Sequence, residues 1–233
     1  MSKGTLVLVH GSWGGGWVWD EVAWQLRAEG WQVLTPTLSG LSERAALLSE
    51  DTDHETHAAD LLQAIGSLSG VVLVGHSYGA LVACVAAARI PQQVRKLVTL
   101  DGFLPVQGRS LFDLHPELQP MLEANLVAGS RWQVAPVPAA AFGIAEGPAA
   151  ARYAQRSTPM PLASHGRPVR DDLAPLAALE RHYLRCTGFP VFAQTAETAR
   201  QQGWRCRELD AGHMVMLSDP GLLAKELALI AAG

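Results

Sequence analysis

The sequence has few cysteines and a small net charge, and these two features exclude disulfide-rich proteins and basic nucleic-acid-binding proteins. Its three cysteines are odd in number and form no Cys-x-x-Cys pair, so no disulfide framework is expected. We interpret Cys84, Cys186 and Cys206 as small core residues, two in strand-like runs and one in an apolar helix. A net charge of −4 and a pI near 6.0 leave no basic surface for nucleic acid, so we expect no such partner.

Long hydrophobic runs are missing too. The apolar run Thr5–Val9 is too short for the core of a signal peptide or for a membrane span. The alanine-rich stretches are interrupted by charge or proline. We therefore predict a soluble, cytoplasmic protein with no membrane partner.

Signals for cofactors are weak. No Gly-Lys-[Ser/Thr] follows Gly14–Gly16, so a nucleotide site is not expected. His54 and His57 lie three residues apart in the predicted first turn of a helix, which is usually solvated, and no third metal ligand is apparent. We predict neither a metal nor an organic cofactor.

What the sequence does contain is an alternation of strands and helices. The strand-like runs are 5–9, 32–35, 71–74, 96–100, 183–186 and 204–209. Helical periodicity fills most gaps: one helix stops at Gly30, a second opens with a Thr52-x-x-Glu55 capping box, and a third, Ala80–Ala88, is apolar all round. The last begins at Ser218 or Asp219, with Pro220 in its first turn. This order predicts an α/β fold with a mostly parallel sheet.

The stretch from about 103 to 175 breaks that alternation. It is rich in proline, alanine and glycine and has no run typical of a core strand. At 233 residues, one domain spanning 1–233 is expected, with this stretch inserted as a cap of short helices and loops.

The most informative stretch is 71–80. A buried strand leads into Gly75-His76-Ser77-Tyr78-Gly79, and an apolar helix follows at once. Such a turn holds a serine oxygen above the sheet at the start of a helix, so Ser77 is the candidate nucleophile.

Several further motifs join this one in a family resemblance. They are Val9-His10-Gly11-Ser12-Trp13, Trp17-x-Trp19, the stretch 36–44, and Gly212-His213-Met214. Together they make the chain resemble the α/β-hydrolase superfamily, and within it the plant methylesterase and hydroxynitrile lyase group with its bacterial esterase relatives. The resemblance covers nearly the whole chain.

The resemblance implies serine esterase chemistry. His213 follows the last strand, where the general base of this fold lies. The backbone amides of Tyr78 and Ser12, the latter in the Gly11-Ser12 loop after the first strand, are the expected donors to an oxyanion. His10 and His76 resemble structural positions.

Three other activities exist on the same fold. In the lyases a lysine follows the catalytic histidine and a threonine replaces the glycine of the first motif, whereas this chain has Met214 and Gly11. Slow-turnover receptor or signalling relatives and cofactor-free dioxygenases can keep the serine, so both stay open.

The triad acid departs from the family pattern. In the plant esterases an aspartate follows the cysteine and threonine that end the penultimate strand, and here Phe189 stands in its place. Asp101 closes the strand after the nucleophile's own, where other hydrolases of this fold carry their acid, so we predict Asp101. The alternative interpretation is that Asp101 only caps a turn. Four other acidic residues are weaker candidates for the triad acid: Asp171, Asp172, Glu197 and Asp210.

The cap is expected to shape a small, mostly hydrophobic acyl pocket, although most of its apolar residues would only pack the cap onto the domain. A small-molecule ester is the expected partner, and a homodimer is left open. The candidate residues are Leu104, Phe112, Leu114, Met121, Leu122, Leu126, Trp132, Phe142 and Met160. His115, His165 and His182 lie in or near this region, with no role that the sequence defines.

Overall fold

Six strands form one parallel sheet in the computed structural model, which describes residues 2–233. Their order is β2-β1-β3-β4-β7-β8, and every neighbouring pair is parallel. The strands are β1 (Thr5–Val9), β2 (Gln32–Leu34), β3 (Val71–His76), β4 (Val94–Leu100), β7 (Glu180–Cys186) and β8 (Arg205–Leu209). The predicted α/β fold with its parallel sheet is confirmed.

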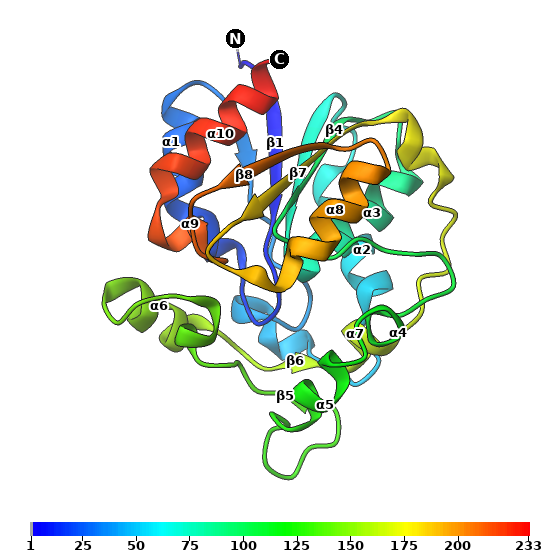
Figure 1. Cartoon of the computed structure of the whole chain (residues 1–233), viewed down its shortest axis with the longest axis vertical. Helices are drawn as coiled ribbons and strands as arrows, with labels where there is room; N and C mark the ends of the chain where they lie inside the picture. The colour runs from blue at the N-terminus through cyan, green and yellow to red at the C-terminus, as the bar shows by residue number, and fades with distance from the viewer. Residues whose placement is uncertain (1) are drawn as a thin grey trace.

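Helices cover both faces of this sheet (Figure 1). One core cluster joins α2 (His54–Ile65), α3 (Tyr78–Arg89) and α8 (Ala193–Gln201) to the strands. The other joins α1 (Asp20–Ala28), α9 (Val215–Ser218) and α10 (Pro220–Ala232) to the opposite face. Alternate side chains of β1 and of residues 71–74 of β3 enter the two clusters, which explains why these two runs are apolar without interruption.

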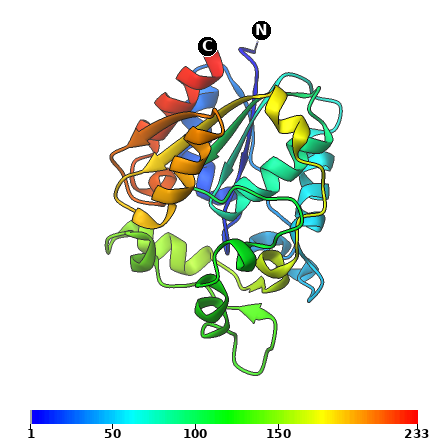
Figure 2. The same cartoon turned by 45° about the vertical axis from the view of Figure 1, so that its right-hand side comes forward.

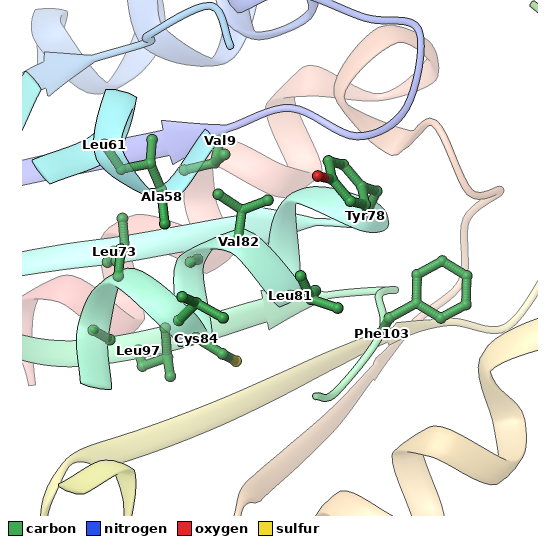
Figure 3. Packing of buried hydrophobic residues seen from close by; sticks show 14 of the residues in the cluster. Val9, Ala58, Leu61, Leu73, Tyr78, Leu81, Val82, Cys84, Leu97 and Phe103 are labelled. Atoms are coloured by element: carbon green, nitrogen blue, oxygen red, sulfur yellow. The ribbon is translucent and has the colours of Figure 1, made fainter. Parts of the chain in front are cut away.

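The helix that carries the serine motif is buried on all sides, as its uniform apolarity predicts. Residues 78–88 of α3 are all buried. Figure 3 shows side chains of α3 between those of α2 and those of the strands, with Tyr78 at the start of the helix. A helix held this firmly fixes the position of whatever precedes its first turn.

One predicted helix start is wrong by a residue. Asp53, not Thr52, is the N-cap of α2, and its side chain accepts hydrogen bonds from the amides of Glu55 and Thr56. Aspartate caps helices as well as threonine does, so the sequence allowed a cap at either residue. In the structure the side chain that reaches the free amides of the first turn is that of Asp53.

The segment between β4 and β7 forms a cap at the carboxyl ends of the strands (Figures 1 and 2). Its two short strands pair with each other and not with the main sheet. Trp13 anchors the cap, because its indole N–H donates to the carbonyl of Val134 at 3.1 Å and its carbonyl accepts from the amide of Thr158 at 3.0 Å. The cap elements are α4 (Leu111–Leu114), α5 (Leu118–Glu123), β5 (Gln133–Val134), α6 (Pro148–Arg156), β6 (Met160–Pro161) and α7 (Ala163–Gly166).

Short 3-10 helices complete the secondary structure. They are Gly16–Trp19, Ser42–Leu47, Ala139–Phe142, Ala174–Ala178 and Pro190–Phe192. Cys84 and Cys186 are buried as expected, whereas Cys206 is only half-buried. Among the helices of residues 2–233, none has both the length and the apolarity that crossing a bilayer needs.

Candidate active site

Ser77 lies in the tight turn between β3 and α3. Its backbone has φ 55° and ψ −123°, a conformation that costs a non-glycine residue on the order of 1–3 kcal/mol. A Cβ on Gly75 would come within 2.4 Å of the Gly79 carbonyl oxygen, and one on Gly79 within 2.3 Å of the His10 carbonyl oxygen. The two glycines therefore let the turn pack against its neighbours, and the strand, turn and helix predicted around Ser77 are all present.

Asp101 and His213 meet at the carboxyl end of the sheet. Nδ1–H of His213 donates to Oδ2 of Asp101 at 2.7 Å, and Oδ1 accepts from the amide of Cys186 at 3.0 Å. The amide of Asp101 in turn donates to the carbonyl of Leu184 at 2.7 Å. The carboxylate thus follows β4 but is held by the end of β7. With Nδ1 engaged, Nε2 of His213 is the ring nitrogen left to act as a base.

Burial affects the protonation of both partners. Asp101 is fully buried and His213 almost so. Burial raises the pKa of the Asp101 carboxyl to about 7, although the Cys186 amide lowers it, and burial lowers the pKa of His213 to about 3. Two N–H donors converge on the carboxylate oxygens, so we favour an ionised Asp101 beside a neutral imidazole. A neutral imidazole is the form that accepts a proton from a serine.

Ser77 and His213 line the same small cavity. Gly11, Ser12 and Phe142 also line it. Within residues 2–233, the amide of Ser12 donates to no backbone carbonyl, and the amide of Tyr78 begins α3, where no intrahelical acceptor exists. Two free N–H groups next to a nucleophile can bind a developing negative charge.

Gly11 lies against the serine at very close range. A Cβ on Gly11 would lie 2.8 Å from Cβ of Ser77 and 3.1 Å from Nδ1 of His76. Any side chain here would therefore displace the nucleophile or the loop. This packing gives a physical reason for glycine at this position.

His10 and His76 hold backbone rather than substrate. Nε2 of His10 accepts from the amide of Leu38 at 3.1 Å, and its Nδ1–H donates to the Gly11 carbonyl at 2.8 Å. Nε2–H of His76 donates to the carbonyl of His213 at 3.0 Å. Burial lowers the pKa of both rings, to about 4 for His10, so both stay neutral. These two histidines fix the loops that carry Ser12 and His213.

The expectation of a solvated first turn at His54 and His57 is wrong. Both side chains are buried. Nε2–H of His57 donates to the carbonyl of Ser39 at 3.0 Å, and its Nδ1 accepts from the hydroxyl of Tyr78 at 2.8 Å. His57 therefore supports the residue after the nucleophile.

Within residues 2–233, none of the weaker acid candidates hydrogen-bonds to His213, whose acidic partner is Asp101. Glu197 is exposed on α8 and pairs with Arg200, and Asp171 pairs with Arg89. The side chain of Asp172 accepts from the amide of Ala174, and Asp210 is exposed. Phe189 does lie close to His213, with ring centroids 4.5 Å apart.

Aromatic rings surround the histidine. Besides Phe189, Phe142 lies 5.3 Å and Phe192 5.5 Å from the centroid of the His213 ring. Of the cap residues expected to shape the pocket, Phe142 is the one that lines the cavity of Ser77, and Met121 is exposed. Phe189 and Phe192 follow β7 and lie outside the predicted cap, so the sequence-based list of pocket residues does not contain them.

A cap histidine that the sequence could not assign also reaches the site. His165 on α7 lies with Nε2 3.4 Å from Oγ of Ser12. In the sequence, only the position of His165 in the insertion suggested a place near the substrate. No local pattern links His165 to Ser12.

Comparisons with known proteins agree with this fold. The model of the "Alpha/beta hydrolase family" matches residues 6–226. The "Carbendazim hydrolyzing esterase" of Nocardioides sp. (strain SG-4G) is 36% identical over 240 residues, covering 95% of this chain and 97% of that protein. "Methylesterase 8" of Arabidopsis thaliana is 34% identical over 108 residues, covering 45% of this chain and 40% of its own.

Solved structures point the same way. An extracellular alpha/beta-hydrolase from a Paenibacillus species, described as sharing structural and functional homology with tobacco Salicylic Acid Binding Protein 2, superposes with a TM-score of 0.80. It is 26% identical and covers 97% of this chain and 98% of its own. Tomato Methylketone Synthase I, at 17% identity and a TM-score of 0.84, shows the shared fold alone, with 99% of this chain and 98% of that one covered. The chain therefore belongs to the alpha/beta hydrolase family, and it is an esterase on that fold.

Proposed function

We propose that this esterase cleaves a small carboxylic ester through an acyl-enzyme, with Ser77 as nucleophile, His213 as general base and Asp101 as the acid. The observation that carries the proposal is the 2.7 Å hydrogen bond between Asp101 and His213, next to a cavity that His213 shares with Ser77. A serine hydroxyl is a weak nucleophile until a base takes its proton.

The reaction has two halves. Nε2 of His213 takes the proton of Ser77 as its Oγ attacks the ester carbonyl, and the amides of Ser12 and Tyr78 hold the resulting oxyanion. His213 then gives the proton to the leaving alkoxide, and the alcohol departs. In the second half His213 activates a water, the same oxyanion forms again, and its collapse releases the acid and frees Ser77. Asp101 keeps His213 in the tautomer that both halves need. Every step uses groups of this chain.

We propose a small, preferably aromatic acyl group, for example a methyl ester of an aromatic or alicyclic acid. The small cavity and the three phenylalanine rings around His213 support it, because flat apolar groups pack well against such rings. The name of the Nocardioides relative makes carbendazim a substrate to include in the test.

The experiment follows turnover of p-nitrophenyl acetate by the wild type and by Ser77→Ala. Steady cycling is expected for the wild type, with kcat at least about 10³-fold lower in the variant. Wild-type rates in the variant would end the proposal, and one slow burst without cycling would favour a receptor-like relative. In a panel of longer esters, a preference for acyl chains beyond about ten carbons would contradict a small pocket.

Release of cyanide from cyanohydrins is the matching assay for lyase chemistry. We expect none, since Met214 lies where the lyases carry a lysine. Oxygen consumption without ester turnover would favour the dioxygenase alternative.

A further inference from the structure

His165 contacts both residues whose amides we assign to the oxyanion. It lies on the cap helix α7 and is only 3% exposed. Its Nε2 is 3.4 Å from Oγ of Ser12, and its ring stacks on Tyr78 with centroids 4.9 Å apart at 20°. A cap residue thus bridges two loops of the main sheet at the point where charge would develop.

The hydrogen bonds determine which ring nitrogen of His165 carries the proton. The hydroxyl of Ser164 donates to the carbonyl of Pro161 at 2.7 Å, so it can only accept from His165, whose Nδ1 lies 2.9 Å away. Burial lowers the pKa of His165 to about 3, so the ring is neutral. Nε2 therefore has a lone pair, and it accepts the O–H of Ser12.

Tyr78 supports one face of the His165 ring. Its hydroxyl donates to Nδ1 of His57, whose Nε2–H donates to the carbonyl of Ser39. Burial lowers the pKa of His57 to about 4, so this arrangement also holds with a neutral ring. The face of Tyr78 is then a fixed platform on which the His165 ring lies.

We propose that His165 is a positioning residue for the oxyanion site: its Nε2 holds the hydroxyl of Ser12, and this contact sets the Ser12 amide in place. The inference rests on the proposed acyl-enzyme function. Oxyanion donors act because they are oriented before charge develops, and a small displacement of one weakens catalysis. The cap would then complete the catalytic site as well as cover it.

Two substitutions separate the hydrogen bond from the packing. His165→Phe keeps an aromatic ring on Tyr78 but has no acceptor, whereas His165→Gln loses the ring and can place an oxygen near the position of Nε2. We expect His165→Phe to lower kcat about 10-fold with KM within about 2-fold, and His165→Gln to stay within about 3-fold of the wild type. A Phe variant near wild type beside a damaged Gln variant would show that the ring matters only for packing, and would overturn the inference. Equal damage in both variants would show that an acceptor at this position does not restore activity, and would also overturn it.

A transition-state mimic gives a second readout. A trifluoromethyl ketone adds to the active-site serine and carries an oxyanion in its bound form. Its inhibition constant should rise about 10-fold in His165→Phe, in step with the loss of kcat. An unchanged inhibition constant would contradict a role at the oxyanion.

Ser12→Ala removes the hydroxyl and keeps the amide. It should reproduce the His165→Phe loss, and the double variant should be no worse than either single variant, because both act on one hydrogen bond. Losses that multiply to about 100-fold would show independent effects and overturn the inference. If His165→Phe does not fold, Ser12→Ala decides alone: unchanged kinetics then refute the inference.

His115→Phe is the matched control. His115 is also a cap histidine next to Phe103, at 5.1 Å between centroids, and it is only half-buried. Its replacement should leave kcat within about 2-fold of the wild type; a loss equal to that of His165→Phe would mean that any cap histidine matters and would overturn the specific role. Ser77→Ala separates the two proposals. Full activity in that variant refutes the acyl-enzyme, whereas an inactive variant beside a fully active His165→Phe refutes only the positioning role.

Discussion

Asp101 and His213 are 112 positions apart in the chain and share a 2.7 Å hydrogen bond. The Cys186 amide holds the other carboxylate oxygen of Asp101, and His76 holds the backbone carbonyl of His213. A carboxylate with no solvent exposure is costly unless it is paired, so the fold itself favours this contact.

Replacing the carboxylate should leave a folded but poor enzyme. Asp101→Asn keeps the shape of the side chain but no longer favours the tautomer with Nδ1–H, so kcat should fall roughly 10²–10⁴-fold. Steady-state kinetics and a thermal unfolding curve measure activity and folding together. The matched controls are Glu197→Gln and Asp210→Asn, which should stay near wild type. A loss in either control with near-normal activity in Asp101→Asn would assign the acid elsewhere.

The pH profile tests whether Asp101 acts through His213. The neutral imidazole is the base, so kcat/KM is high above the pKa of His213 and is lost below it. A neighbouring carboxylate stabilises the imidazolium and raises that pKa, whereas burial lowers it towards about 3. Asp101→Asn leaves burial alone, so the acid limb of its residual activity should move to lower pH. A limb that stays in place or moves upward would contradict an ionised Asp101 beside His213.

Much of the sheet could be predicted because its strands contain apolar runs, which are continuous in β1 and in residues 71–74 of β3. Where charged residues continue a strand, the prediction fell short: β7 begins at Glu180, three residues before the predicted run. Glu180 belongs to the sheet through an ion pair with the buried Lys96, whose Nζ lies 3.1 Å from Oε1. Hydropathy cannot detect a strand that is completed by paired charge.

Some residues of the candidate active site could likewise be predicted from the sequence, and others could not. A local motif marks Ser77, and chain order marks His213, but the contacts of His57 and His165 form only when distant segments meet. His165 and Ser12 are 153 positions apart in the chain, and no residue pattern near His165 predicts their contact. Phe189 departs from the family pattern in the sequence alone, whereas its approach to the His213 ring, at 4.5 Å between centroids, follows only from the fold.

A side chain at Gly11 should slow the reaction. The Cβ of Gly11→Ala would lie 2.8 Å from Cβ of Ser77, a distance that real Cβ atoms essentially never show, so the loop or the nucleophile must shift. We expect kcat to fall at least about 10-fold, because a small misplacement of the reacting groups is enough to slow the chemistry. Gly108→Ala is not a suitable control, since Gly108 has φ 79°, whereas Gly221→Ala meets only ordinary contacts at 3.8 Å. Normal kinetics in Gly11→Ala would show that the loop relaxes without cost.

The last prediction asks whether the acid can be moved from one strand end to the next. Phe189 occupies the position of the plant aspartate, and its ring lies 4.5 Å from that of His213, so a carboxylate there starts within reach of the imidazole. In the background of Asp101→Asn, adding Phe189→Asp should regain about 10-fold of the lost kcat, because either carboxylate can stabilise the imidazolium. Phe189→Asn in the same background is the matched control: it removes the same ring without supplying a charge and should regain nothing. Equal recovery in both would mean that loss of the ring, and not the new carboxylate, is responsible. No recovery in either would show that the end of β7 can no longer deliver an acid to His213, and that the histidine loop is fitted to Asp101 alone.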